Sequence, residues 1–188
     1  MYVAGIDEVG RGPLAGPVSI GIVWTKKGLD LKERYPTLND SKKLSEKKRE
    51  EIYELAKKDN DISYVVVSNA AKVIDEKGIE FAIRDAIARG CKKIPEDTFI
   101  YLDGRLKAPE AFSQETVVGG DTKVPAISLA SIMAKVERDR YLKKMSQDYP
   151  KYGFHKHKGY GTRAHMDAIA EFGLSELHRV SFCRNLIK

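Results

Sequence analysis

Four acidic side chains stand in positions that differ from those of ordinary surface acids. Asp7 and Glu8 end the apolar run of AGIDEVG, Asp103 ends that of FIYLDG, and Asp121 follows the glycine pair of VVGGD. Carboxylates that lie close together repel one another unless a cation lies among them. Ligation by oxygen atoms alone suits Mg²⁺ or Mn²⁺. These four acids are therefore candidate catalytic residues that would bind a divalent metal.

The geometry of the first acidic pair sets two conditions on this hypothesis. A lone acid beside a glycine more often caps a turn or pairs with an arginine. Asp7 and Asp103 can meet only if their strands are neighbours, because the carboxyl ends of adjacent strands open into one crevice. Successive residues of a strand point to opposite faces. We therefore expect the first strand to end or bulge at Asp7 and Glu8, where Gly10 and Gly12 supply backbone freedom.

A basic and aromatic segment is the second candidate for chemistry. Residues 149–166 hold four Lys or Arg residues, three of the four histidines, four aromatic rings and no acid. Cations neutralise phosphates, and rings such as that of Tyr160 stack on sugars or bases, as in a nucleic-acid groove. A solvated loop with buried tyrosines would have the same composition. Zinc binding by His155 and His157 would need a third ligand at suitable spacing.

Two short loops offer groups that suit a phosphate or a hydroxyl. The sequence Gly10-Arg11-Gly12 presents backbone N–H groups and a guanidinium next to the first two acids. The sequence from Asn39 to Lys42 offers an amide, a hydroxyl and an ammonium group. Each loop is equally well explained as a plain turn.

The elements that must position these residues follow an α/β pattern. We predict strands at residues 3–6, 17–25, 62–67 and 98–102, with a short extended piece at 115–118. Helices are predicted after Ser45, at residues 79–89 with Gly90 as the closing residue, at 126–145, and from Thr162 to about Gly173. Alanines on one face of the 126–145 helix would let it lie close to a sheet. The first two strands are expected to be inner strands of a mixed sheet.

Composition narrows the class of protein. The chain has 188 residues, 42% of them hydrophobic, which suits one compact domain with an ordinary core. A net charge of +6 favours an anionic partner. No apolar run reaches the length of about 18 residues that a membrane helix needs. Cys91 and Cys183 lack any metal-site or disulfide spacing, so we expect reduced thiols in a cytoplasmic protein.

Several strings, in the same order along the chain, carry a resemblance to a known family. They are GIDEVGRGPLAGPV from residue 5, NDSKKLS at 39–45, YLDG at 101–104, GGD at 119–121, SLASIMAKVERDR at 128–140, HKHKGYGT at 155–162 and LHRVSF at 177–182. Together they resemble ribonuclease HII, the type 2 ribonuclease H family.

The resemblance implies a fold and an activity. The fold would be RNase H-like, an α/β structure with a central mixed five-stranded sheet flanked by helices and a small helical C-terminal extension. Residues 1–145 would form the catalytic core and residues 146–188 an extension that clamps the substrate, within one compact unit. Members of the family cut the RNA strand of RNA/DNA hybrids. They also cut 5′ of single ribonucleotides in duplex DNA, which leaves a 3′-hydroxyl and a 5′-phosphate.

The resemblance also implies roles for individual residues. The four catalytic acids of the family fall on the four acids singled out above. The glycine–arginine–glycine stretch would recognise the 2′-hydroxyl through its backbone, Tyr160 would stack on the sugar of the following deoxynucleotide, and Asn39 and Lys42 would hold phosphates. The implied site residues are Asp7, Glu8, Asp103 and Asp121 for catalysis and metal binding, and Gly10, Arg11, Gly12, Asn39, Lys42 and Tyr160 for the substrate.

The mechanism expected from these residues is hydrolysis with two Mg²⁺ or Mn²⁺ ions about 4 Å apart, one activating water and the other stabilising the leaving oxygen. The partners would be RNA/DNA hybrids and DNA duplexes that contain ribonucleotides, with no membrane, no obligate protein partner and a monomeric chain. The alternative is a module that binds RNA/DNA hybrids without cutting them. A binder of polyanions has no reason to keep four acids beside its groove, which favours the enzyme.

Overall fold

The computed structural model describes residues 1–186. Its strands and main helices, in chain order, are β1 (Tyr2–Val9), β2 (Val18–Lys26), α1 (Leu31–Arg34), α2 (Glu46–Lys58), β3 (Ser63–Asn69), α3 (Ala71–Lys77), α4 (Ile79–Cys91), β4 (Thr98–Asp103), β5 (Gln114–Val117), α5 (Gly120–Lys123), α6 (Pro125–Asp148), α7 (Phe154–His157), α8 (Arg163–Phe172) and α9 (Val180–Cys183). A short 3₁₀ turn, Pro150–Tyr152, precedes α7.

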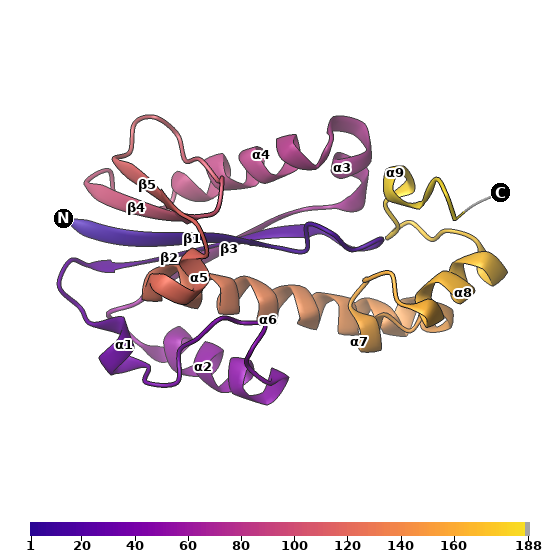
Figure 1. Ribbon diagram of the computed structural model, residues 1–188, viewed down its shortest axis with the longest axis horizontal. Helices are drawn as coiled ribbons and strands as arrows, with labels where there is room; N and C mark the ends of the chain where they lie inside the picture. Colours follow the sequence, from indigo (N-terminus) through magenta and orange to yellow (C-terminus); the bar gives the residue numbers. More distant parts are fainter. Residues whose placement is uncertain (187–188) are drawn as a thin grey trace.

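The strands form one mixed sheet of five strands in the order β3-β2-β1-β4-β5. The pairs β1–β2 and β2–β3 are antiparallel, whereas β1–β4 and β4–β5 are parallel. Both of the first two strands are inner strands, as the sequence predicts. Figure 1 shows α3 and α4 on one face of the sheet, α2 and α6 on the other, and α7 to α9 at one end. The α/β fold with a mixed five-stranded sheet is thereby confirmed.

Alternation along β1 assigns its side chains to the two faces. Ala4 and Ile6 are fully buried and belong to the apolar cluster on the α4 side. Gly5 lies on the other face, where a methyl group at its position would overlap the main chain of Ala126 in α6. Gly21 of β2 makes a similarly close approach to Ala130. The small residues on both elements therefore let α6 lie directly against the sheet, as predicted.

Helix ends follow the capping residues with one exception. The hydroxyl of Ser45 accepts a hydrogen bond from Lys48 N, and that of Thr162 accepts one from His165 N. Gly90 does not close α4, which continues to Cys91. A Cβ at Gly90 would lie 2.6 Å from Ile22 Cδ1. That glycine is therefore explained by close packing against β2, and the prediction that it ends the helix was wrong.

The C-terminal part is joined to the rest of the protein by the long helix α6 and by a β-bridge. The expected boundary between residues 145 and 146 falls inside α6, which runs on to Asp148. Ala15 and His178 form an isolated antiparallel bridge, so the residues before α9 pair with the connection between β1 and β2. Within residues 1–186, no helix combines the length and the apolar character needed to cross a membrane.

Candidate active site

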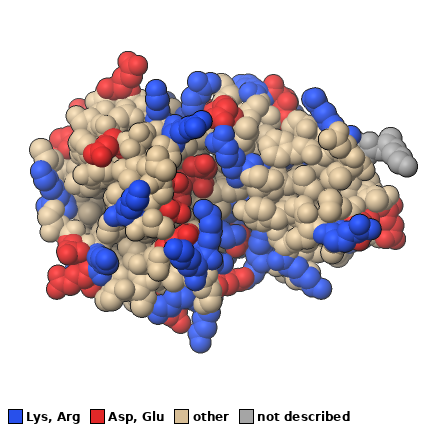
Figure 2. All heavy atoms as spheres, viewed as in Figure 1, with Lys and Arg blue, Asp and Glu red and all other residues tan. Residues whose placement is uncertain are grey.

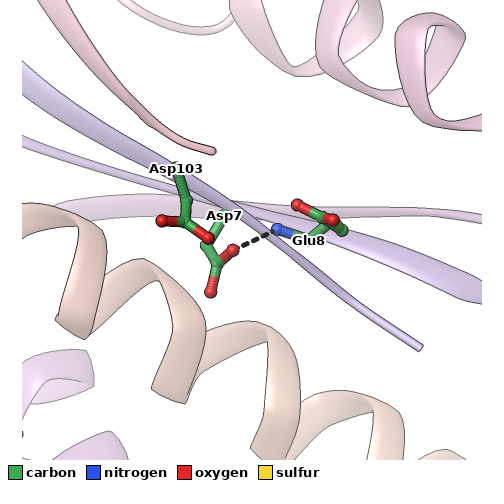
Figure 3. Close-up of side chains that lie close together, drawn as sticks. All are labelled: Asp7, Glu8 and Asp103. Carbon is green, nitrogen blue, oxygen red and sulfur yellow. Dashed lines mark hydrogen bonds between the residues drawn. The ribbon is translucent and has the colours of Figure 1, made fainter. Parts of the chain in front are cut away.

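Three of the four predicted acids converge at the carboxyl end of the sheet. Asp7, Glu8 and Asp103 each offer a carboxylate oxygen, and these oxygens all lie within 4.8 Å of one another. Figure 3 shows the three side chains at the junction of β1 and β4. The strands are parallel neighbours, with Ile6 opposite Leu102, so the next residues along, Asp7 and Asp103, follow side by side on the α6 face.

Glu8 joins the group although β1 does not end or bulge there. Regular pairing with β2 continues through Glu8 opposite Ile20 and Val9 opposite Ser19. The expected interruption of the strand was therefore wrong. Pairing with β4 stops at Ile6, so the last residues of β1 have a free edge beside Asp103. In Figure 3 the carboxylates of Asp7 and Glu8 point away from one another, and Glu8 approaches the group along that free edge.

Burial gives these carboxylates unusual electrostatics. Burial raises the pKa of Asp7 from 3.8 to about 7, with the neighbouring charges of Glu8 and Asp103 adding to the rise. Hydrogen bonds from Ser131 and from the backbone of Glu8 act in the opposite direction. Burial also raises the pKa of Glu8, and the guanidinium of Arg11 opposes that rise. The group is costly to ionise without a cation, which is the condition that favours metal binding.

Asp121 lies beside the group but outside the three residues whose oxygens meet within 4.8 Å. It is buried at the start of α5, and burial together with the charge of Asp103 raises its pKa. The backbone N–H of Gly120 donates to Asp103 Oδ1 at 2.7 Å, which ties α5 to the end of β4. The ammonium of Lys42 lies 3.7 Å from Asp121 Oδ2, so the expected phosphate-binding lysine faces the acids.

The donor set fits a hard divalent cation. All three converging ligands are carboxylates, and oxygen ligands are the preference of Mg²⁺ and Mn²⁺. Within the described part of the chain, this is the one group of at least three His, Cys, Asp or Glu side chains arranged to hold a metal. His155 and His157 do not form a zinc site: His155 Nδ1 contacts the hydroxyl of Ser146, and His157 Nε2 lies 2.7 Å from the carbonyl oxygen of Tyr152.

The two glycines beside the acids differ in what the protein requires of them. Gly10 has φ of +85°, and a Cβ there would collide with the side chain of Arg138. Gly12 has open space around the place of a Cβ. The side chain of Arg11 between them is half exposed and forms an ion pair with Glu80 of α4. The fold therefore explains Gly10 but gives no reason for a glycine at position 12.

The remaining predicted substrate residues, Asn39 and Tyr160, are both exposed. Asn39 is exposed and lines a polar cavity with Thr122 and Lys123, next to Asp121. Tyr160 is 43% exposed, with its ring over Lys135 and Arg138. On the face of the molecule that Figure 2 shows, acidic side chains gather in a central hollow, with Lys and Arg side chains on both sides of it.

Sequence reasoning missed the residues that hold this site in place. Ser131 of α6 lowers the pKa of Asp7, and its hydroxyl lies 2.9 Å from that of Ser41 in the loop before α2. Two arginines, Arg138 and Arg179, are almost completely buried beneath residues 10–17. Both lie in strings that carry the family resemblance, SLASIMAKVERDR and LHRVSF, and that position was the only signal in the sequence.

Comparison with known proteins agrees with the resemblance. The family model of ribonuclease HII matches residues 4–185. Ribonuclease HII of Aliarcobacter butzleri is 45% identical over 181 residues, which cover 96% of this chain and 90% of the relative. Ribonuclease HII of Clostridium perfringens is 44% identical over 188 residues, which cover 99% of this chain and 68% of the relative.

Solved structures share the fold. The ribonuclease H2 of Pyrococcus horikoshii superposes with a TM-score of 0.80 at 25% identity, covering 99% of this chain and 97% of that one. RNase HII of Archaeoglobus fulgidus, solved in complex with PCNA, gives 0.80 at 26% identity and covers 98% and 96% of the two chains. With a matching family model, close relatives and an acidic group at the end of β1 and β4, the chain belongs to the ribonuclease HII family, the metal-dependent type 2 ribonucleases H.

Proposed function

We propose that this protein is an endonuclease that hydrolyses the RNA strand of RNA/DNA hybrids and cuts 5′ of single ribonucleotides in duplex DNA. The products would be a 3′-hydroxyl and a 5′-phosphate. The observation that carries the proposal is the meeting of Asp7, Glu8 and Asp103, with the cations of Arg11 and Lys42 beside them. The acids suit metal ions, and the cations suit the two phosphate backbones of a duplex.

The role proposed for the acids is to hold two Mg²⁺ or Mn²⁺ ions, with Asp121 as the fourth ligand. Such ions would supply Lewis acidity and charge neutralisation at the scissile phosphate. The chain itself orients the ligands. The N–H of Glu8 donates to Asp7, and the N–H of Gly120 donates to Asp103. The oxygens not engaged by these donors stay available for a cation.

The substrate would be positioned by the groups around the acids. Lys42 and Asn39 lie on the side of Asp121, where an ammonium and an amide suit phosphates. Tyr160 presents an exposed ring beside Arg138, and such a ring suits stacking on a sugar. The 2′-hydroxyl would be read between them by the backbone of Gly10, Arg11 and Gly12, where a deoxyribose offers no partner.

The division of labour between the two parts of the chain is also proposed. Residues 1–145 would supply the chemistry, and residues 146–188 would clamp the duplex against it.

The proposed location is the cytoplasm. Cys91 and Cys183 are both free and buried, which suits the reducing cytoplasm.

The test is incubation of the purified protein with Mg²⁺ or Mn²⁺ and a labelled duplex that carries one ribonucleotide. We expect a cut on the 5′ side of the ribonucleotide that depends on the metal. Binding without a cut would indicate a hybrid-binding module instead. If the protein neither binds nor cuts the duplex, the proposal of a nucleic-acid substrate is wrong. The same incubation with a chelator in place of the metal is the control.

A further inference from the structure

The side chain of Arg179 is fully buried, and each of its nitrogen atoms donates to a backbone carbonyl. Nη2 donates to Gly10 O at 2.6 Å, Nη1 to Arg11 O at 2.9 Å and Nε to Gly16 O at 3.0 Å. One guanidinium thus holds two successive peptide groups of the Gly10-Arg11-Gly12 stretch and the far end of the same connection. Planar geometry with several fixed donors is a property of arginine that lysine lacks.

This arginine has no carboxylate partner among residues 1–186. Burial, and then the neighbouring charge of Arg138, lowers its pKa to about 9. A buried cation without a counter-ion is costly, so its hydrogen bonds to residues 10–16 must compensate for the loss of water. Arg179 therefore stabilises the conformation of residues 10–16 through hydrogen bonds and takes part in no ion pair among residues 1–186.

The captured carbonyls fix the direction of the next N–H groups. In a planar trans peptide, the C=O of one residue and the N–H of the next point in opposite directions. With the carbonyls of Gly10 and Arg11 directed inward to Arg179, the N–H groups of Arg11 and Gly12 are directed outward. Neither N–H has a hydrogen-bond acceptor in the part of the chain that is described. Two donors are therefore presented to a ligand, beside open space at Gly12.

Arg179 itself is held firmly. Its N–H donates to Leu14 O at 2.8 Å, and the preceding residue, His178, pairs with Ala15 in a β-bridge. On the other side, the carboxylate of Asp75 in α3 accepts from Val180 N at 2.8 Å and from Ser181 N at 2.9 Å. The position of the guanidinium is thus set from two directions.

We propose that Arg179 is the positioning residue for ribose selectivity, which aims the N–H groups of Arg11 and Gly12 at the 2′-hydroxyl by holding the carbonyls behind them. The proposal rests on the proposed function and adds to it the residue on which selectivity depends. Arg179 does not touch the substrate in this arrangement, because it lies beneath the loop.

Arg138 provides a matched control within the same chain. It is 1% exposed and also donates to three backbone carbonyls, those of Pro17, Ala15 and Lys158. It therefore shares the burial, the charge and the number of captured carbonyls, but it holds neither Gly10 O nor Arg11 O. A general loss of packing would affect both arginines, whereas a loss of N–H direction would follow Arg179 alone.

The test compares Arg179→Lys with Arg138→Lys and the wild type. Each protein cuts a duplex that carries one ribonucleotide, with the same duplex without the ribonucleotide as competitive inhibitor. The ratio of the inhibitor's Ki to the substrate's KM reports recognition of the 2′-hydroxyl. We expect Arg179→Lys to lower this ratio about tenfold, the effect of one lost hydrogen bond, and Arg138→Lys to keep it. Thermal unfolding should show a similar loss of stability in both.

The outcomes separate this inference from the proposed function. A wild-type protein that does not cut the duplex with the ribonucleotide would overturn the proposed function. A wild-type protein that cuts it but binds both duplexes equally would leave the proposed function standing and overturn this inference, because binding would then show no selectivity for Arg179 to secure. A selective wild type together with a selective Arg179→Lys would overturn the role of Arg179, as would an equal loss of the ratio in both lysine variants.

A second variant covers the case in which Arg179→Lys does not fold. Asp75→Ala removes the acceptor that holds the backbone of Val180 and Ser181 and leaves the buried guanidinium in place. We expect a smaller fall in the ratio of Ki to KM, with the rate of cutting at saturating substrate less affected. An unchanged ratio in a folded Asp75→Ala protein, with Arg179→Lys unfolded, would overturn the proposal.

Discussion

Two clusters of like charge lie near the connection between β1 and β2, and their surroundings differ. The acidic cluster combines a buried Asp7 with a partly exposed Glu8 and Asp103. The basic pair of Arg138 and Arg179 is buried beneath the connection. In the acidic cluster, the nearest cation to the carboxylate of Glu8 is the guanidinium of Arg11 at 3.9 Å, and burial still raises the pKa of Glu8. In the basic pair, every guanidinium nitrogen donates to a carbonyl.

The difference shows how to tell a binding site from a structural element when both contain like charges. Satisfied donors mean that the charge has its partners within the chain, so the basic pair acts on the shape of the chain and binds no external ion. Unsatisfied oxygens, raised pKa values and access from outside mean that the acidic cluster needs an external cation. Removing a charge should therefore abolish chemistry in the first cluster and destabilise the fold in the second.

The largest effect is expected in the acidic cluster. Asp103→Asn should reduce metal-dependent cutting by about a thousandfold, several kcal/mol of transition-state stabilisation, while hybrid binding is kept. Single-turnover cleavage and fluorescence anisotropy measure the two properties, and thermal unfolding should show no loss of stability because one repelling charge is gone. Undiminished turnover would refute the role of Asp103.

The next effect belongs to the basic pair. Arg138→Met should leave the carbonyls of Ala15, Pro17 and Lys158 without donors and cost about 3 kcal/mol. For a chain of this size, that lowers the melting temperature by about 10 °C. Scanning calorimetry of the metal-free protein measures it. A melting temperature equal to that of the wild type would contradict the structural assignment of the pair.

A smaller effect links the acidic cluster to stability through pH. The pKa of Asp7 rises from 3.8 in the unfolded chain to about 7 in the fold. The folded state therefore holds its proton more tightly, and the resulting stability is present at low pH and lost as the pH rises through about 7. Between pH 5 and pH 8 the metal-free protein should lose about 3 kcal/mol of its free energy of unfolding.

Urea unfolding in a chelator at several pH values measures this loss, and saturating Mg²⁺ should reverse it. Asp7→Asn is the control, since it removes the titrating group and should flatten the dependence. An equally steep loss in Asp7→Asn would assign the effect to other groups.

The smallest effect is expected at Tyr160, on the border between the clusters. Tyr160→Ala should weaken cutting at an RNA-to-DNA junction about tenfold, the contribution of one stacking ring, and should affect an all-RNA strand less. Tyr141→Ala is the matched control, because Tyr141 is 39% exposed against 43% for Tyr160. Equal losses on both substrates would count against stacking on the deoxyribose.

Much of the fold could be predicted from the sequence because local patterns and global packing agree. The five strands, the long helix and the caps at Ser45 and Thr162 all follow from hydrophobic period and capping chemistry. The approach of Asp7 to Asp103 also follows, because acids that end neighbouring parallel strands must lie at one edge. These elements depend mainly on residues close together in sequence.

The rest depends on contacts that no local pattern records. Glu8 approaches the acidic cluster because β4 stops pairing at Leu102, a property of the neighbouring strand. Gly90 reads as a helix end but packs on Ile22. Arg179 donates to residues 163 to 169 positions away in sequence. A buried arginine without a carboxylate partner contradicts the ordinary expectation for charged residues, so the sequence predicted neither its burial nor its role.

The length of α6 determines the distance and the rotation between the sheet and the C-terminal part. This single helix, Pro125–Asp148, packs on β1 and β2 and also on α7. Each residue of an α-helix advances the chain by about 1.5 Å and turns it by about 100°. Inserting one residue in the middle of α6 would therefore rotate the C-terminal part out of register with the sheet. Loops elsewhere can change in length, but the separation between the two parts is counted in helical residues and tolerates no such change.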